Sequence, residues 1–180
     1  MNIIGIDLGS QKAAYTSISG DISDPKFQTK LITATNAKDS VEQRFSVILT
    51  SLKASIEYYN PELVICEYPF NIQGHARILV EMFGVIRYHC LINDIPFVVL
   101  PQTKIKKYIT GSGKAEKSDI RMQVYKEFNL DLSEDEADSF WIAHMGMTYL
   151  YGTDKQFRQT SIDDMRKPKT KKSKGGKKND

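Results

Sequence analysis

Four acidic residues stand where they could act together on a phosphodiester bond. Asp7 closes the apolar run NIIGID, and Glu67 closes the run ELVICE. Asp135 and Asp138 are three residues apart in a stretch with helical periodicity, so they share one helix face. Carboxylates hold Mg²⁺ well, and two divalent ions about 4 Å apart can activate a water and stabilise a leaving oxygen. The pattern therefore predicts a carboxylate site for metal-assisted hydrolysis.

Each acid also has a structural interpretation. Asp7 precedes a Leu-Gly pair and suits an Asx-turn. Asp135 lies in a first helical turn, where a negative charge offsets the helix dipole. Glu67 and Asp138 are harder to explain in this way, because both adjoin apolar residues and acids are rarely buried without a partner.

The elements that must hold these acids follow from the spacing of apolar residues. Two capping-box patterns, Asp39 with Glu42 and Ser133 with Glu136, mark helix starts. The predicted strands are 2–7, 13–18, 26–34, 62–67 and 96–100, and the predicted helices are 39–58, 74–93, 115–128 and 133–149. This order predicts an α/β fold with an RNase H-like layout. Its five-stranded mixed sheet has three antiparallel strands, then βαβ units, and is flanked by helices.

The predicted helix over residues 74–93 is apolar nearly all round. A helix without a polar face is buried on two sides. In a chain of 180 residues, we expect one of those sides to contact a second subunit. The sequence therefore predicts a homodimer formed through this helix.

Basic residues concentrate in two places. Seven Lys and Arg lie between Lys104 and Lys126, which favours a phosphate-facing surface over an ordinary solvated one. Residues 165–180 hold eight Lys and Arg against one Asp, about +7; subtracting this from the chain's +3 leaves about −4 for the rest. We predict a folded domain over 1–152 and a basic, disordered tail over 153–180. The tail either binds phosphates non-specifically or only adds solubility.

Four motifs resemble, in order and spacing, those of the RuvC family of Holliday junction resolvases. They are IIGIDLGS at 3–10, ICEYPF at 65–70, GSGKAEKSDI at 111–120 and EDEADSFWIAH at 134–144. Each motif is weak alone, but four in sequence are specific, and the resemblance covers about residues 3–150. Leu8 stands where the family usually has Pro, and the basic tail is not a standard part of the bacterial enzyme. These departures suggest a phage or other divergent member.

The resemblance implies a structure-selective endonuclease that resolves Holliday junctions, with forks and flaps as further substrates of a divergent member. It implies a two-metal mechanism with Mg²⁺ as cofactor, for which Mn²⁺ substitutes, and branched DNA as partner. It assigns catalysis and metal binding to Asp7, Glu67, Asp135 and Asp138.

The resemblance also implies DNA-binding residues. It assigns Phe70 as an aromatic that stacks on a base, whereas the residue types alone also allow a core position. It assigns DNA contacts to Lys106 and Lys117, the former less securely because other lysines are close by. The wider set that we predict to bind DNA adds Lys104, Lys107 and Lys114.

Three other functions fit parts of the pattern. GIDLGS also opens actin-like ATPases and sugar kinases, but those need a second lobe and a second phosphate loop. A catalytically inactive module that binds branched DNA is less favoured, because all four acids are present. An RNA-processing nuclease of the same fold is the remaining alternative.

The two cysteines and the lengths of the apolar runs indicate the cellular compartment in which the protein is expected. Cys66 and Cys90 lie in apolar stretches and are predicted to be small buried residues rather than a disulfide or metal site. The sequence shows no signal peptide and no run of 18 apolar residues. We therefore expect a cytoplasmic protein, in a bacterial or phage-infected cell, without a membrane partner.

Overall fold

The first strand lies at the centre of a five-stranded sheet in the computed structural model, which describes residues 1–34, 39–69 and 76–152. The strands are β1 (Asn2–Leu8), β2 (Lys12–Asp21), β3 (Asp24–Thr33), β4 (Leu63–Glu67) and β5 (Phe97–Leu100). Their order is β3-β2-β1-β4-β5. β1 to β3 pair antiparallel, whereas β4 pairs parallel with both β1 and β5. The predicted mixed sheet is confirmed.

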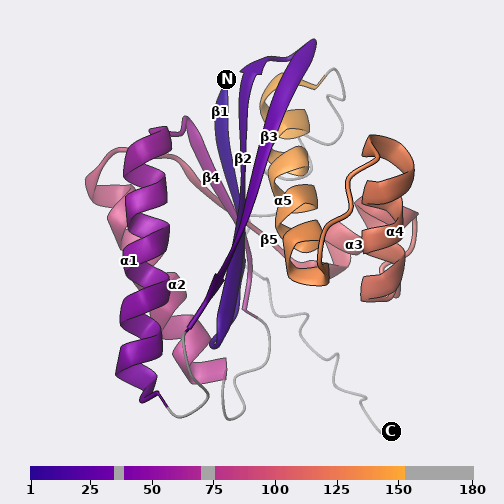
Figure 1. Ribbon diagram of the computed structural model, residues 1–180. Coiled ribbons are helices and arrows are strands. Elements are labelled where there is room, and N and C mark those ends of the chain that lie inside the picture. Colours follow the sequence, from indigo (N-terminus) through magenta and orange to yellow (C-terminus); the bar gives the residue numbers. More distant parts are fainter. Residues whose placement is uncertain (35–38, 70–75, 153–180) are drawn as a thin grey trace, which may run out of the picture.

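Helices cover both faces of the sheet (Figure 1). They are α1 (Val41–Tyr59), α2 (Ala76–Ile92), α3 (Gln102–Thr110), α4 (Lys117–Phe128) and α5 (Glu134–Tyr151). α1 and α2 lie on one face, and α5 lies on the other with α3 and α4 beside it. Alternate residues along the strands contribute to two hydrophobic cores, one on each face of the sheet. Ile4 and Ile6 pack with α1 and α2, whereas Ile3 packs with α5.

One predicted helix start was wrong, and one helix was not predicted. α1 begins after Ser40, whose side chain accepts from the Gln43 backbone N–H, so the capping pair is not Asp39 with Glu42. α3 was not predicted, because lysines dominate its composition. Ile105 and Ile109, one helical turn apart, are nevertheless both buried and anchor it. The capping box of α5, by contrast, forms as predicted from Ser133 and Glu136.

Both cysteines are buried and free, as expected. Among the described residues, none of the helices is long and apolar enough to span a bilayer. The predicted tail, residues 153–180, lies outside the described part of the chain.

Candidate active site

Asp7 and Glu67 come from adjacent parallel strands at the same edge of the sheet. Ile6 of β1 is in register with Cys66 of β4, so the acid that follows each of them lies at the same level. The strands run parallel, so their carboxyl ends meet at this edge. The sheet therefore brings together two carboxylates that are 60 residues apart in the sequence.

α5 adds the other two acids because it approaches β1 closely at Gly5. A Cβ atom built on Gly5 would lie only 2.2 Å from the Ala143 backbone nitrogen. The missing side chain lets the helix backbone rest directly on the strand. Asp138, little more than one turn before Ala143, thereby reaches the Asp7 end of β1.

A hydroxyl chain fixes α5 on the sheet at a second point. The Thr16 hydroxyl of β2 lies 2.9 Å from the Ser139 hydroxyl of α5 and 2.9 Å from the Thr29 hydroxyl of β3. Thr16 and Ser139 are fully buried, so these hydrogen bonds are needed to satisfy them. Ser139 directly follows Asp138, and its bond restricts how that part of the helix can shift.

Burial, together with neighbouring charges, raises the pKa values of three of the four acids. Burial, then the charges of Asp138 and Glu67, raises the pKa of Asp7 to about 8. Burial and the charge of Asp138 raise the pKa of Glu67 to about 7. Burial also raises the pKa of Asp138 above its usual range. Full ionisation of these three acids at neutral pH therefore calls for a nearby cation.

Lys117 supplies positive charge to this cluster. Its Nζ atom lies 3.2 Å from Asp138 Oδ2 and 3.3 Å from Asp135 Oδ1. Burial disfavours the ammonium form, but Asp138 and Asp7 outweigh that cost and hold the pKa of Lys117 above its usual range. Asp135 is the outermost of the paired acids, with 32% of its side chain exposed against 13% for Asp138.

The predicted DNA-binding lysines divide into two groups. Lys106 of α3 and Lys117 are close enough to the acids for their charges to offset part of the rise in the pKa of Glu67 and Asp138. Lys107, on α3, and Lys114, between α3 and α4, are exposed. Lys104 is also on α3 and is half-buried. Phe70 lies outside the described residues.

The cluster suits a hard divalent cation. Its donors are all carboxylate oxygens, and their mutual repulsion would be relieved by a doubly charged ion. In the chain as described, with its gaps at 35–38 and 70–75, no three acids are arranged as a formed metal-ligand set. Metal coordination would require the acid side chains to rearrange and Lys117 to move away from Asp135 and Asp138.

Sequence reasoning missed Gly5 and the Thr16–Ser139 contact, which position α5. Gly5 carried a usable signal, because a glycine inside an apolar strand often marks a close backbone approach. The hydroxyl pair carried none, because its members are 123 residues apart. The ion pairs of Lys117 were also unforeseen, although the motif that contains the residue was noted.

Comparisons with known proteins agree on one family. The family model described as "Crossover junction endodeoxyribonuclease RuvC" matches residues 3–144. A protein of that name from Prochlorococcus marinus (strain MIT 9303) is 31% identical over 150 residues, which cover 81% of this chain and 97% of the relative. Another from Carboxydothermus hydrogenoformans is 31% identical over 161 residues and covers 84% and 99%.

Solved structures are similar in fold. The RuvC structure of Thermus thermophilus matches with a TM-score of 0.68 and 18% identity, over 85% of this chain and 98% of that one. The T. thermophilus protein in complex with a Holliday junction substrate also gives 0.68, at 18% identity, over 84% and 93%. At this identity the likeness concerns the fold, and it agrees with the RNase H-like layout predicted from the order of elements.

Proposed function

Because this chain belongs to the crossover junction endodeoxyribonuclease RuvC family, we propose that it is a structure-selective endodeoxyribonuclease that resolves four-way DNA junctions. The observation that carries the proposal is the convergence of Asp7, Glu67 and Asp138, with Asp135 at their solvent side, at one sheet edge. Forks and flaps are proposed as further substrates.

The four acids are proposed to hold two Mg²⁺ ions, for which Mn²⁺ substitutes. When bound, such ions supply a nucleophilic water and stabilise the leaving 3′ oxygen. Asp7 and Glu67 lie on strands, and Asp138 lies on a helix that is bonded to the sheet, so the site has a rigid base. The chain's part in the reaction is to hold its carboxylates in place, and bound metal ions would favour their ionised form.

The lysines of α3 and the following loop are proposed to bind the DNA backbone. Lys107 and Lys114 are exposed and can track phosphates beside the acids. Lys106 and Lys117 are nearer the acids and are proposed to contact the phosphates next to the cleaved bond. Phe70, in the segment between β4 and α2, is proposed to stack on a base at the junction. A protein acting on cellular or phage DNA belongs in the cytoplasm, where we place it.

The exposed face of α2 is proposed to form a homodimer interface. Its apolar side chains at the surface are Val80, Val85, Tyr88, Leu91 and Ile92, exposed by 42%, 38%, 62%, 71% and 58%. Five large apolar side chains exposed on one helix are unusual on a monomer. Two copies related by a two-fold axis would present two sites to a junction, as paired cuts require.

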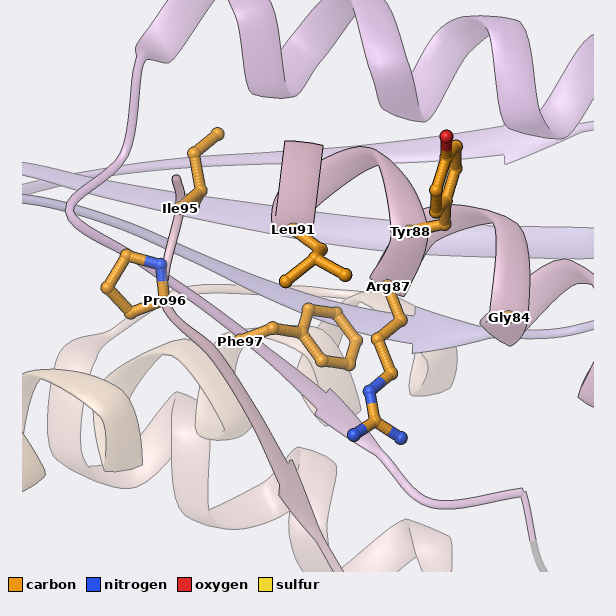
Figure 2. A pocket seen from close by; sticks show the side chains of 7 residues that line it. All are labelled: Gly84, Arg87, Tyr88, Leu91, Ile95, Pro96 and Phe97. Carbon is orange, nitrogen blue, oxygen red and sulfur yellow. The ribbon is translucent and has the colours of Figure 1, made fainter. Parts of the chain in front are cut away.

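A groove beside this face strengthens the dimer proposal. Gly84, Arg87, Tyr88 and Leu91 of α2 line it together with Ile95, Pro96 and Phe97 (Figure 2). The groove is near the start of β5, whereas Glu67 pairs with Leu100 at the strand's other end. It is therefore separate from the acids, and a second subunit could fill it without blocking DNA.

The test is cleavage of labelled four-way, three-way, flap and linear DNA, and of structured RNA, with Mg²⁺, with Mn²⁺ and with chelator. We expect symmetric cuts in the four-way junction that depend on metal. Binding of junctions without cleavage under all conditions would favour an inactive binding module. Preferential cutting of RNA would favour the RNA-processing alternative.

A further inference from the structure

Lys117 lies between the acids and solvent. Its Nζ atom pairs with Asp135 and Asp138, and its charge offsets part of the rise in the pKa of Asp7 and Glu67. The lysine side chain is 45% exposed, whereas that of Asp138 is only 13% exposed. The ammonium therefore reaches the cluster from outside and can withdraw the same way along its flexible stem.

The helix that carries Lys117 does not itself favour a lysine there. Lys117 is the first residue of α4, where the partial positive charge of the helix dipole repels a cation. The acids of α5 provide the compensating attraction. The Trp141 indole N–H donates to the Ile120 carbonyl over 3.2 Å and so fastens the first turns of α4 to α5. The lysine is thus held close to the acids by tertiary packing.

We propose that Lys117 is a built-in counterion of the acidic cluster and that it competes with the divalent metal. The same oxygens of Asp135 and Asp138 serve either the ammonium or the metal, so metal loading requires Lys117 to withdraw. Once withdrawn, the ammonium is available to a DNA phosphate at the site. This inference rests on the proposed function, which assigns these acids as metal ligands.

A lysine that competes with the metal and a lysine that only supports the site's shape predict opposite effects of replacing Lys117 on Mg²⁺ affinity. Replacing Lys117 with Met removes the competing charge and keeps an apolar stem of similar length. Mg²⁺ binding to the DNA-free protein should then tighten by roughly tenfold or more, because a unit charge a few ångströms from the ion no longer opposes it. If Lys117 instead only supported the site's shape, its loss would weaken metal binding.

The experiment is calorimetric titration of Mg²⁺ into DNA-free full-length wild type, Lys117→Met, Lys117→Arg and Lys126→Met. Lys126→Met is the matched control, since it makes the same charge change on the same helix, nine residues or roughly 13 Å further along. We expect Lys126→Met and Lys117→Arg to bind Mg²⁺ like wild type. Equal or weaker binding by Lys117→Met, relative to Lys126→Met, would overturn the inference.

A second measurement avoids any folding defect of the variant. Lysines of the wild-type fold are labelled by reductive ¹³C-methylation, which keeps their charge, and the Lys117 and Lys126 signals are assigned from their Arg variants. Adding Mg²⁺ should move the Lys117 signal and leave that of Lys126 in place. A Lys117 signal that does not respond to saturating Mg²⁺ would also overturn the inference.

The proposed function and the inference fail in different ways. If wild type binds Mg²⁺ and cuts junctions but Lys117→Met gains no affinity, only the counterion role is refuted. If wild type neither binds Mg²⁺ nor cuts DNA, both are refuted.

Discussion

Asp7 and Glu67 occupy equivalent ends of adjacent strands, so an amide at either position should have similar consequences. We expect Asp7→Asn and Glu67→Gln each to slow junction cleavage by at least about 100-fold, because a metal-holding charge is removed from a preorganised site. Junction binding, measured by gel shift, should persist. Asp24→Asn, the same change at the opposite end of the sheet, is the control and should cut normally. Full activity in either site variant would refute the assignment.

The raised pKa of Asp7 predicts how stability depends on pH without metal. The folded chain holds this proton up to about pH 8, whereas the unfolded chain releases it near 3.8. The folded state thus binds more protons in that window, and stability should fall as pH rises through it. Thermal unfolding in chelator between pH 5 and 8 should show this slope in wild type and a smaller one in Asp7→Asn. If the stabilities of wild type and Asp7→Asn change equally with pH, the pKa of Asp7 is not raised.

At the scale of elements, the contact between β1 and α5 decides whether the acids meet. Gly5→Ala should cost about 1–3 kcal/mol of stability, because overpacking forces backbone shifts. It should also slow cleavage in protein that remains folded, since α5 moves away from Asp7. Urea unfolding and single-turnover cleavage measure the two effects.

A second substitution, at Ala143, tests which atoms of that residue the methyl group added at Gly5 would contact. The added methyl would meet the Ala143 backbone nitrogen at 2.2 Å and its Cβ at 2.7 Å. Adding Ala143→Gly removes only the Cβ, so it should restore little. Full recovery of the double variant would show that backbone contact does not set the distance between strand and helix.

At the scale of the whole molecule, the α2 face predicts a dimer that a surface charge should break. Leu91→Asp should yield a folded monomer in analytical ultracentrifugation at micromolar concentration, because a charge cannot be buried unpaired in an apolar interface. Met122→Asp is the control, since Met122 is 50% exposed on α4, away from α2. A monomeric wild type, or a dimeric Leu91→Asp, would contradict the proposal. A substitution at Ile86 would not test the dimer interface, because Ile86 is buried in the hydrophobic core of its own subunit.

The basic tail is expected to act on the whole molecule as an electrostatic tether. Deleting residues 165–180 should weaken binding to junction and linear duplex about equally. The slope of log affinity against log salt should become shallower by roughly 0.9 for each phosphate that the tail no longer neutralises. Cleavage at saturating enzyme should survive, because the acids and the α3 lysines remain. A deletion that removes only the preference for junctions would instead show that the tail recognises the substrate.

Local patterns in the sequence were enough to predict the five strands, four of the five helices and four candidate acids. Alternating apolar residues mark strands, helical spacing marks amphipathic helices, and both patterns are local properties of a chain. Asp7 and Glu67 could be placed because each closes an apolar run, and Ser133 because its capping partner is three residues away. The family's motifs are likewise contiguous and could be recognised without a structure.

Only the folded chain could establish what depends on residues far apart in the sequence. Which side of α2 faces outward is fixed by the sheet beneath it, so an all-round apolar pattern could not separate Ile86 from Leu91. The pairing of Lys117 with Asp135 and Asp138 spans two helices that are brought together by tertiary packing, including the contacts of Trp141 with Ile120 and of Phe128 with Phe140. The raised pKa of Asp7 arises from burial and from Asp138 and Glu67. Such properties belong to the assembled surroundings of a residue, because charge and burial act through space rather than along the sequence.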